Sequence, residues 1–280
     1  MTNPIADPMV ESVDSDADSK LVRIESTPEG AVTVWINRPA RKNAFDSLTI
    51  AALHEAFETL SGAEGVRIAF VRGAGASFSA GADVQWMRDA VDLTEDDNRA
   101  DALNMARMLK ALSDLPFLTV ALVEGAAFGG GVGLVAACDM ALATTGAKFS
   151  FSEVKLGLVP ATISPYVVAA IGPRAAKALF ATARVFDAAY AAKIGLVDEV
   201  VADSAALDAA KDRLAAEIMA CAPRAVADSK ELVNEVWGRP IDESLMHETS
   251  RRIASARVGQ EGQEGVRAFL DKRKASWSTL

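Results

Sequence analysis

Two glycine-rich segments could supply backbone N–H groups to a reacting oxygen atom. The first is Phe78–Asp83, with the sequence FSAGAD, and the second is Gly125–Gly133, with the sequence GAAFGGGVG. Each follows a β-rich run and precedes a helical pattern, which is where ligands bind in open α/β folds. Glycine lets two backbones approach closely, and the first N–H groups of a helix have no partner inside it. If the segments converge, they offer two hydrogen-bond donors to a developing oxyanion.

The elements that must position these segments alternate between strand and helix. Short β-rich runs predict strands at 32–36, 67–71, 119–123, 139–144 and 196–201. Apolar residues spaced by three and four predict helices at about 47–60 and 98–112. This order predicts an α/β domain with mostly parallel strands.

The chain divides into three regions. Residues 1–20 carry five acidic side chains and are interpreted as a disordered acidic leader. Residues 21–203 form the αβ core, and residues 204–280 show only helical patterns, at about 205–220, 224–237, 242–257 and 263–274. Helices that cannot bury their apolar faces on their own sheet are expected to bury them on a second copy, so we expect an oligomer.

Composition argues against nucleic acid as a partner and against secretion or a membrane span. The net charge is −9, which argues against nucleic acid because binding there depends on neutralising phosphates. Only Cys138 and Cys221 occur, and the N-terminal residues resemble no secretory leader, so we expect a reduced, cytoplasmic protein. The longest weakly charged stretch, 117–138, is too rich in glycine to predict a membrane span.

Two other kinds of site are considered and set aside. Residues 131–136 fit the dinucleotide pattern G-x-G-x-x-A, and Glu153 has the spacing of a ribose-binding acid. However, seven residues separate this pattern from the preceding strand, whereas a dinucleotide loop follows its strand directly. His54 and His247 are two lone histidines, so no metal site is predicted.

A series of motifs resembles the crotonase (enoyl-CoA hydratase/isomerase) superfamily. The series contains Asn37-Arg38-Pro39, the two glycine-rich segments, Cys138-Asp139, the segment FSFSEVKLGLVP at 149–160 and the closing segment 264–274. It extends over about residues 21–277. The resemblance implies a core of ββα turns arranged as a spiral, a C-terminal helical trimerisation region, and an acyl-CoA thioester substrate.

The resemblance also implies roles for particular residues. The N–H groups of Ala82 and Gly130 would form the oxyanion hole. CoA would run past Ala80, Ala82, Asp83, Val84 and Gln85, with Arg41 or Lys42 near a phosphate and with Phe269 and Lys272 reaching it from the C-terminal helix. No separate cofactor is implied, because CoA is part of the substrate. The expected assembly is a homotrimer or a dimer of trimers.

One position departs from the family's pattern. Well-known hydratases carry two glutamates, and the positions that correspond to them here hold Gly133 and Glu153. Glu153 is therefore the implied catalytic acid and base. A single acid must both activate water and deliver a proton during hydration, whereas double-bond isomerisation needs only one base.

Three activities remain open at this point. The segments around 129–139 and 152–168 resemble bacterial branched-chain enoyl-CoA hydratases that act on methylglutaconyl-CoA or related carboxylated thioesters and share the glycine at 133. We therefore expect addition of water across the 2,3 double bond of an enoyl-CoA. The alternatives are a Δ3–Δ2 enoyl-CoA isomerase that uses Glu153, and a non-catalytic acyl-CoA-binding subunit.

Overall fold

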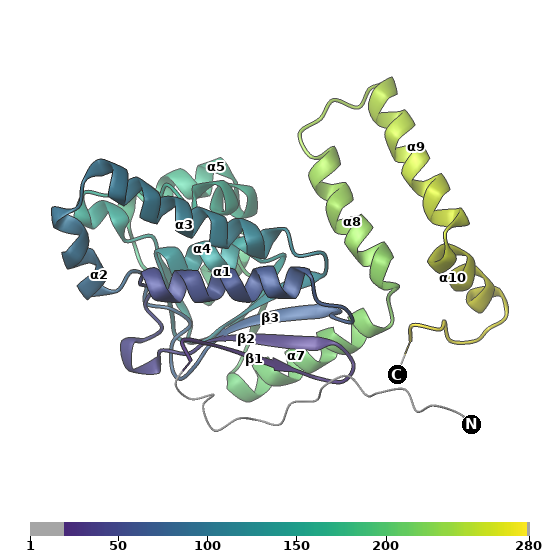
Figure 1. Cartoon of the computed structure of the whole chain (residues 1–280), viewed down its shortest axis with the longest axis horizontal. Coiled ribbons are helices and arrows are strands. Elements are labelled where there is room, and N and C mark those ends of the chain that lie inside the picture. The colour runs from purple at the N-terminus through teal and green to yellow at the C-terminus, as the bar shows by residue number, and fades with distance from the viewer. Residues whose placement is uncertain (1–19, 279–280) are drawn as a thin grey trace, which may run out of the picture.

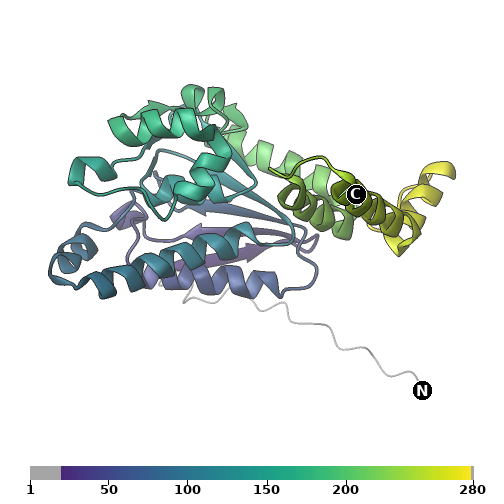
Figure 2. The same ribbon diagram turned by 90° about the horizontal axis from the view of Figure 1, so that it is seen from above.

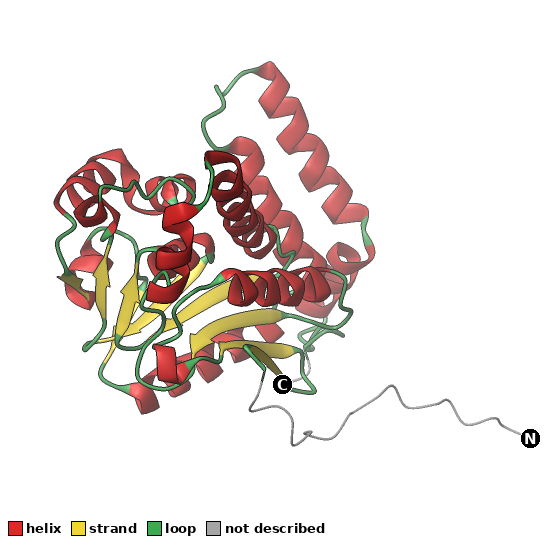
Figure 3. Ribbon diagram, turned by 60° about the vertical axis from the view of Figure 1, so that its left-hand side comes forward, coloured by secondary structure: helices red, strands yellow, loops and turns green. Residues whose placement is uncertain are grey.

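A six-stranded sheet forms the centre of the protein in a computed structural model, which describes residues 20–278 (Figures 1 and 3). The sheet order is β1-β2-β3-β4-β6-β9. Its strands are β1 (Val22–Ser26), β2 (Ala31–Ile36), β3 (Ile68–Gly73), β4 (Leu118–Val123), β6 (Met140–Thr144) and β9 (Glu199–Val201). All neighbours pair in parallel except β1 and β2, which confirms the prediction of mostly parallel strands.

Helices cover both faces of this sheet. Successive side chains of a strand point to opposite faces, so Ile68 and Phe70 of β3 pack on one side while Ala69 and Val71 pack on the other. Helices α1 (Ser47–Ser61) and α3 (Glu95–Ser113) cover one face, and α7 (Ser204–Met219) covers the other (Figure 1). Although α7 falls in the range that the sequence assigned to the helical region, its buried leucines pack against Phe70 and other residues of the sheet. The packed core therefore extends to about Met219.

A smaller sheet and four helical segments lie beside the large sheet. The strands are β5 (Ala126–Phe128), β7 (Lys148–Ser150) and β8 (Phe186–Asp187). The helical segments are α4 (Gly130–Ala137), the 3₁₀ turn η4 (Glu153–Leu156), α5 (Ser164–Thr182) and α6 (Ala188–Lys193). Helix α5 is not predicted from the sequence, because Gly172, with φ +72°, and Pro173 interrupt its helical pattern.

Side-chain caps begin the helices around the first glycine-rich segment. The carboxylate of Asp46 accepts the N–H of Thr49 at the start of α1, and that of Asp83 accepts the N–H of Gln85 at the start of α2 (Val84–Asp89). Each cap satisfies one of the N–H groups that a helix leaves unpaired. Two short 3₁₀ turns, η2 (Pro39–Arg41) and η3 (Ala90–Asp92), complete this part of the chain.

The last three helices extend away from the core as an arm (Figure 2). They are α8 (Pro223–Val236), α9 (Glu243–Val258) and α10 (Gln260–Leu270). The Glu261 carboxylate of α10 accepts hydrogen bonds from the N–H groups of Arg224 and Ala225, both at 2.9 Å. These bonds join the last helix of the arm to the start of α8. No helix among residues 20–278 has the length and apolar character needed to cross a bilayer.

A lysine of α8 contacts the core. The Nζ of Lys230 in α8 lies 2.8 Å from Asp139 Oδ2 and donates to Leu115 O at 2.8 Å. Its side chain is only 15% exposed. Charge-assisted hydrogen bonds at a half-buried site contribute more than surface ion pairs do.

We therefore expect Lys230→Met to lower the free energy of unfolding by about 2 kcal/mol, since it leaves Asp139 and a carbonyl without their cation. Urea denaturation measures this change, and limited proteolysis should cut the loop before α8 faster. Lys110→Met removes an exposed ion pair with Asp114 and serves as the control. Equal effects of the two substitutions would contradict the anchoring role.

Candidate active site

The two glycine-rich segments lie side by side, as the sequence predicts. Ser79 and Ala127 form a parallel bridge, in which Ser79 N donates to Ala126 O and Phe128 N donates to Ser79 O, both at 2.9 Å. A Cβ on Gly81 would lie 2.9 Å from Phe128 O, and Gly81 has φ +89°. Glycine at this position therefore permits the close approach of the segments.

The backbone around Ala82 directs its N–H away from its neighbour. Phe45 N donates to Gly81 O, and Asp83 N donates to Phe45 O, both at 2.7 Å. This pattern is a parallel bridge between Phe45 and Ala82. Because consecutive backbone N–H groups of extended chain point to opposite sides, the N–H of Ala82 faces away from Phe45.

Gly130 begins α4, so its N–H has no acceptor within the helix. The preceding Gly129 N donates to Ser150 O at 2.9 Å, which fixes the start of α4 against β7. A Cβ on Gly130 would lie 2.9 Å from Met105 Cε, so this position too is closely packed. Ala82 and Gly130 thus occupy the two segments that meet.

Glu153 begins η4 beside the second segment. A Cβ built on Gly129 would lie 3.2 Å from Glu153 Oε1, so the carboxylate contacts the residue next to Gly130. Among residues 20–278, no hydrogen-bond partner exists for the buried Oε2 atom of Glu153. Burial raises the pKa of this carboxyl group above its ordinary value, against a smaller lowering by its own backbone N–H. A half-buried acid with one unpartnered oxygen can exchange a proton with a bound molecule.

The position of the missing second acid is filled by another side chain. A Cβ on Gly133 would lie 2.1 Å from Ile163 Cγ2 and 2.7 Å from Ile163 Cβ. Ile163 is buried, at 2% exposure. No side chain fits at residue 133 while isoleucine occupies residue 163. The sequence alone gave Ile163 no role, because its contact with Gly133 joins residues thirty positions apart.

Most of the residues expected to bind CoA gather near the first segment. Arg41 and Lys42 are exposed in and beside η2, and Lys42 O accepts the N–H of Ala80 at 2.9 Å. Val84 and Gln85 are exposed at the start of α2. The Asp83 side chain is 6% exposed and is held by Arg38 at 3.2 Å. Its carboxylate therefore has a structural role, which leaves only its backbone for CoA.

Two expected CoA contacts lie elsewhere within one chain. Phe269 is 83% exposed on α10, and Lys272 follows the end of that helix. The arm that carries them projects from the end of the core opposite α2 (Figure 1). The fold of a single chain therefore does not bring Phe269 and Lys272 to the segments that contain Ala82 and Gly130.

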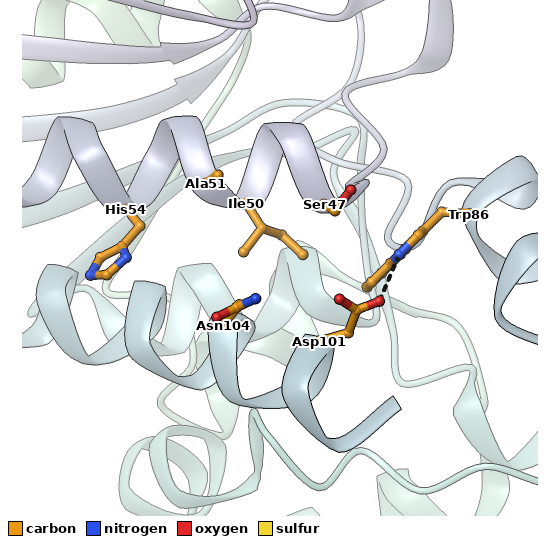
Figure 4. A pocket seen from close by; sticks show the side chains of 7 residues that line it. All are labelled: Ser47, Ile50, Ala51, His54, Trp86, Asp101 and Asn104. Atoms are coloured by element: carbon orange, nitrogen blue, oxygen red, sulfur yellow. Dashed lines mark hydrogen bonds between the residues drawn. The ribbon is translucent and has the colours of Figure 1, made fainter. Parts of the chain in front are cut away.

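A separate cavity of about 170 Å³ lies between α1 and α3 (Figure 4). Its lining residues are Ser47, Ile50, Ala51, His54, Trp86, Asp101 and Asn104. Trp86 Nε1 donates to Asp101 Oδ2 at 3.3 Å. The lining contains a carboxylate and no lysine or arginine, so it does not suit the phosphates of CoA.

Residues 26–279 match the Enoyl-CoA hydratase/isomerase family, over nearly the whole described chain. The chain belongs to this family. A Thermus thermophilus protein named as a candidate enoyl-CoA hydratase is 34% identical over 86% of this chain and 94% of its own. The crotonyl-CoA hydratase of Syntrophomonas wolfei is 32% identical over 89% of this chain and 95% of its own.

Solved structures of the family share the fold. A crotonase from Legionella pneumophila, described as a candidate enoyl-CoA hydratase/isomerase, is 43% identical, with a TM-score of 0.87 over 92% of this chain and 98% of its own. The expected fold class is thereby confirmed: an α/β crotonase-like core is followed by C-terminal helices. Family membership makes the protein an enzyme of acyl-CoA chemistry.

Proposed function

We propose that the protein adds water across the 2,3 double bond of an enoyl-CoA thioester, with Glu153 as its only acid and base. The observation that carries this proposal is the buried, unpartnered Oε2 of Glu153, beside the meeting point of the two glycine-rich segments. Relatives named enoyl-CoA hydratase and crotonyl-CoA hydratase support hydration over other reactions of the family.

In this mechanism, the thioester oxygen accepts hydrogen bonds from the N–H groups of Ala82 and Gly130. Ionised Glu153 takes a proton from water, whose oxygen forms a bond to C3 while the C2–C3 π electrons move toward the thioester. The two N–H groups stabilise the resulting enolate oxygen without any change in their own protonation. The protonated Glu153 then delivers its proton to C2, which restores the carboxylate and completes the addition of one water molecule.

The CoA moiety would lie along the first segment. We propose that the backbone of Ala80 and of residues 82–85 contacts it, and that Arg41 or Lys42 pairs with a phosphate. These exposed cations offset the net charge of −9 locally. The acyl group would be branched or carboxylated, as in methylglutaconyl-CoA.

The contact between Gly133 and Ile163 favours a second candidate, a Δ3–Δ2 enoyl-CoA isomerase. Because Ile163 fills the space beside Gly133, a carboxylate at residue 133 cannot hold the water that attacks C3. Isomerisation needs only Glu153, which would remove a proton from C4 and return it to C2.

A panel of substrates separates these candidates. We expect crotonyl-CoA or 3-methylglutaconyl-CoA to lose the absorbance of the conjugated enoyl thioester as water adds. A 3-enoyl-CoA that instead gains this absorbance would establish the isomerase. Tight binding of every thioester with no turnover would contradict both and favour a non-catalytic subunit.

We also propose that the arm packs on further copies of the chain, giving a homotrimer or a dimer of trimers. Its large apolar side chains are exposed in the single chain, among them Trp237, Ile241, Val258, Phe269 and Leu270. Exposed apolar surface of this kind marks interaction sites. Assembly would also allow Phe269 and Lys272 to reach the CoA of a neighbouring copy. A monomeric mass by light scattering would contradict this proposal.

A further inference from the structure

The side chain of Arg38 joins the two backbone segments that carry the bridge between Phe45 and Ala82. Its guanidinium contacts the neighbours of both bridged residues, namely Ala44 O at 2.5 Å, Asp46 Oδ2 at 2.8 Å and Asp83 Oδ2 at 3.2 Å. The Arg38 side chain is 14% exposed, so these contacts are largely shielded from water. Charge-assisted hydrogen bonds in such surroundings are short and directional.

Backbone hydrogen bonds to Phe45, at Gly81 O and at Asp83 N, hold the residues on either side of Ala82. Gly81 precedes it in a left-handed conformation that favours glycine. Asp83 follows it, and that carboxylate is fixed by two groups, the Gln85 N–H at 2.8 Å and Arg38. These contacts lower the pKa of Asp83, the Gln85 N–H first and the Arg38 charge after it, so Asp83 stays ionised as a partner for Arg38.

Arg38 is itself held in place from the core side. Asn43 Oδ1 accepts the N–H of Arg38 at 2.9 Å, and Asn43 Nδ2 donates to Ala74 O at 2.9 Å and to Ser77 O at 2.7 Å. Asn43 is fully buried. A continuous set of hydrogen bonds thus runs from the end of β3, through Asn43 and Arg38, to the residue after Ala82.

We propose that Arg38 is a positioning residue that orients the N–H of Ala82 toward the thioester oxygen. The inference rests on the proposed function, because it assigns to Arg38 the geometry of one oxyanion donor. The planar guanidinium reaches two carboxylates and a carbonyl at once, whereas a lysine ammonium presents a single point of charge. Lysine at residue 38 would therefore keep the charge and lose the geometry.

The test compares Arg38→Met and Arg38→Lys with Arg67→Met. Arg67 is also partly buried, and it donates to Ile218 O and Cys221 O at the end of α7, on the other side of the sheet. The control therefore removes an arginine that binds carbonyl groups without touching the segments around Ala82. The purified full-length variants are assayed for kcat, KM and thermal midpoint with the best substrate of the panel.

A second readout reports the hydrogen bonds to the thioester oxygen directly. A chromophoric aryl-enoyl-CoA shifts its absorbance to longer wavelength when its carbonyl is polarised. For Arg38→Met we expect a 10- to 100-fold lower kcat, a KM within about threefold of the starting protein, and a reduced red shift of the bound chromophore. Arg38→Lys is expected to recover less than about a tenth of the lost rate, and Arg67→Met to keep both kcat and the red shift.

The outcomes separate the two proposals. If Arg38→Met keeps the red shift and kcat of the starting protein, Arg38 does not position Ala82, although the proposed function stands. A loss of kcat with an unchanged red shift would also overturn the positioning role. If the starting protein neither turns over any enoyl-CoA nor polarises the chromophore, the proposed function fails, and the role of Arg38 fails with it.

Discussion

Glu153→Gln is expected to lower kcat for enoyl-CoA hydration by about 10³-fold while KM changes by less than about threefold. The amide keeps the size of the side chain but can neither accept a proton from water nor return one to C2. Residue 133, where well-known hydratases carry a second glutamate, is Gly133 and cannot take over either step. The loss should therefore fall within the range of about 10²- to 10⁴-fold seen for acid–base groups.

Steady-state kinetics with the best substrate of the panel measures this loss. Glu58→Gln provides the control, since Glu58 is an exposed glutamate of α1 that lies 3.6 Å from His54. Full activity of Glu153→Gln would remove Glu153 from the mechanism. A comparable loss in both variants would show that the effect is not specific to the site.

The raised pKa of Glu153 also predicts how kcat/KM depends on pH, in the starting protein and in Glu153→Gln. The ionised form takes the proton from water, so kcat/KM should fall as the pH is lowered through the raised pKa of Glu153. The acid side of the profile should therefore lie above the ordinary pKa of a glutamate. This ionisation should be absent from the residual activity of Glu153→Gln.

Glu153→Gln should stabilise the folded protein at neutral pH, although it lowers activity. Burial raises the pKa of Glu153 in the folded protein, so its contribution to stability is present below the unfolded pKa and is lost as the pH rises through the folded pKa. Glu153→Gln should therefore raise the thermal midpoint at neutral pH and have little effect in acid. An equal shift at both pH values would contradict burial of the charge as the cause.

Gly133→Glu is expected to lower the free energy of unfolding by about 3 kcal/mol or more. Its Cβ would overlap Ile163 Cγ2, and the new carboxylate would be buried. The double substitution Gly133→Glu with Ile163→Gly removes the overlapping side chain. It should recover much of that loss and place a second acid beside the substrate. Urea denaturation measures both changes.

The activity of the double variant tests why a single acid suffices here. With two carboxylates to divide the proton transfers, we expect hydration of crotonyl-CoA to rise by about 10-fold, with a second ionisation in the pH profile. Gly146→Glu is the matched control, because a Cβ there meets no atom within 4 Å. If Gly133→Glu alone is as stable as Gly146→Glu, Ile163 does not exclude a side chain from residue 133.

The sequence predicted the parts of the fold that have a clear period. The strands β2, β3 and β4 follow from short β-rich runs, and the helices α1 and α3 from the three- and four-residue spacing of their apolar side chains. The strands β5, β7 and β8 have only two or three residues, which is too short for any period. Helix α5 was missed because Gly172 and Pro173 lie inside it.

At the candidate site, the sequence predicted the meeting of the two glycine-rich segments but not the side-chain contacts around them. The two glycine-rich segments follow parallel strands, and such strand ends meet at one edge of a sheet, so their convergence could be anticipated. The contact of Ile163 with Gly133 could not, because no pattern in the sequence links an isoleucine to a glycine thirty residues away. Arg38 stood in a recognised motif, yet its role depends on which carboxylates surround it in space.

The packing of α7 on the sheet has a consequence for the order in which a nascent chain can fold. Phe70, Val120 and Leu122 are buried on the face that α7 covers, and they precede it by more than eighty residues. During synthesis, this face stays uncovered until Met219 has left the ribosome, long after the opposite face can close with α1 and α3. Translation therefore leaves an apolar surface exposed for a defined interval, during which the half-built domain is open to aggregation.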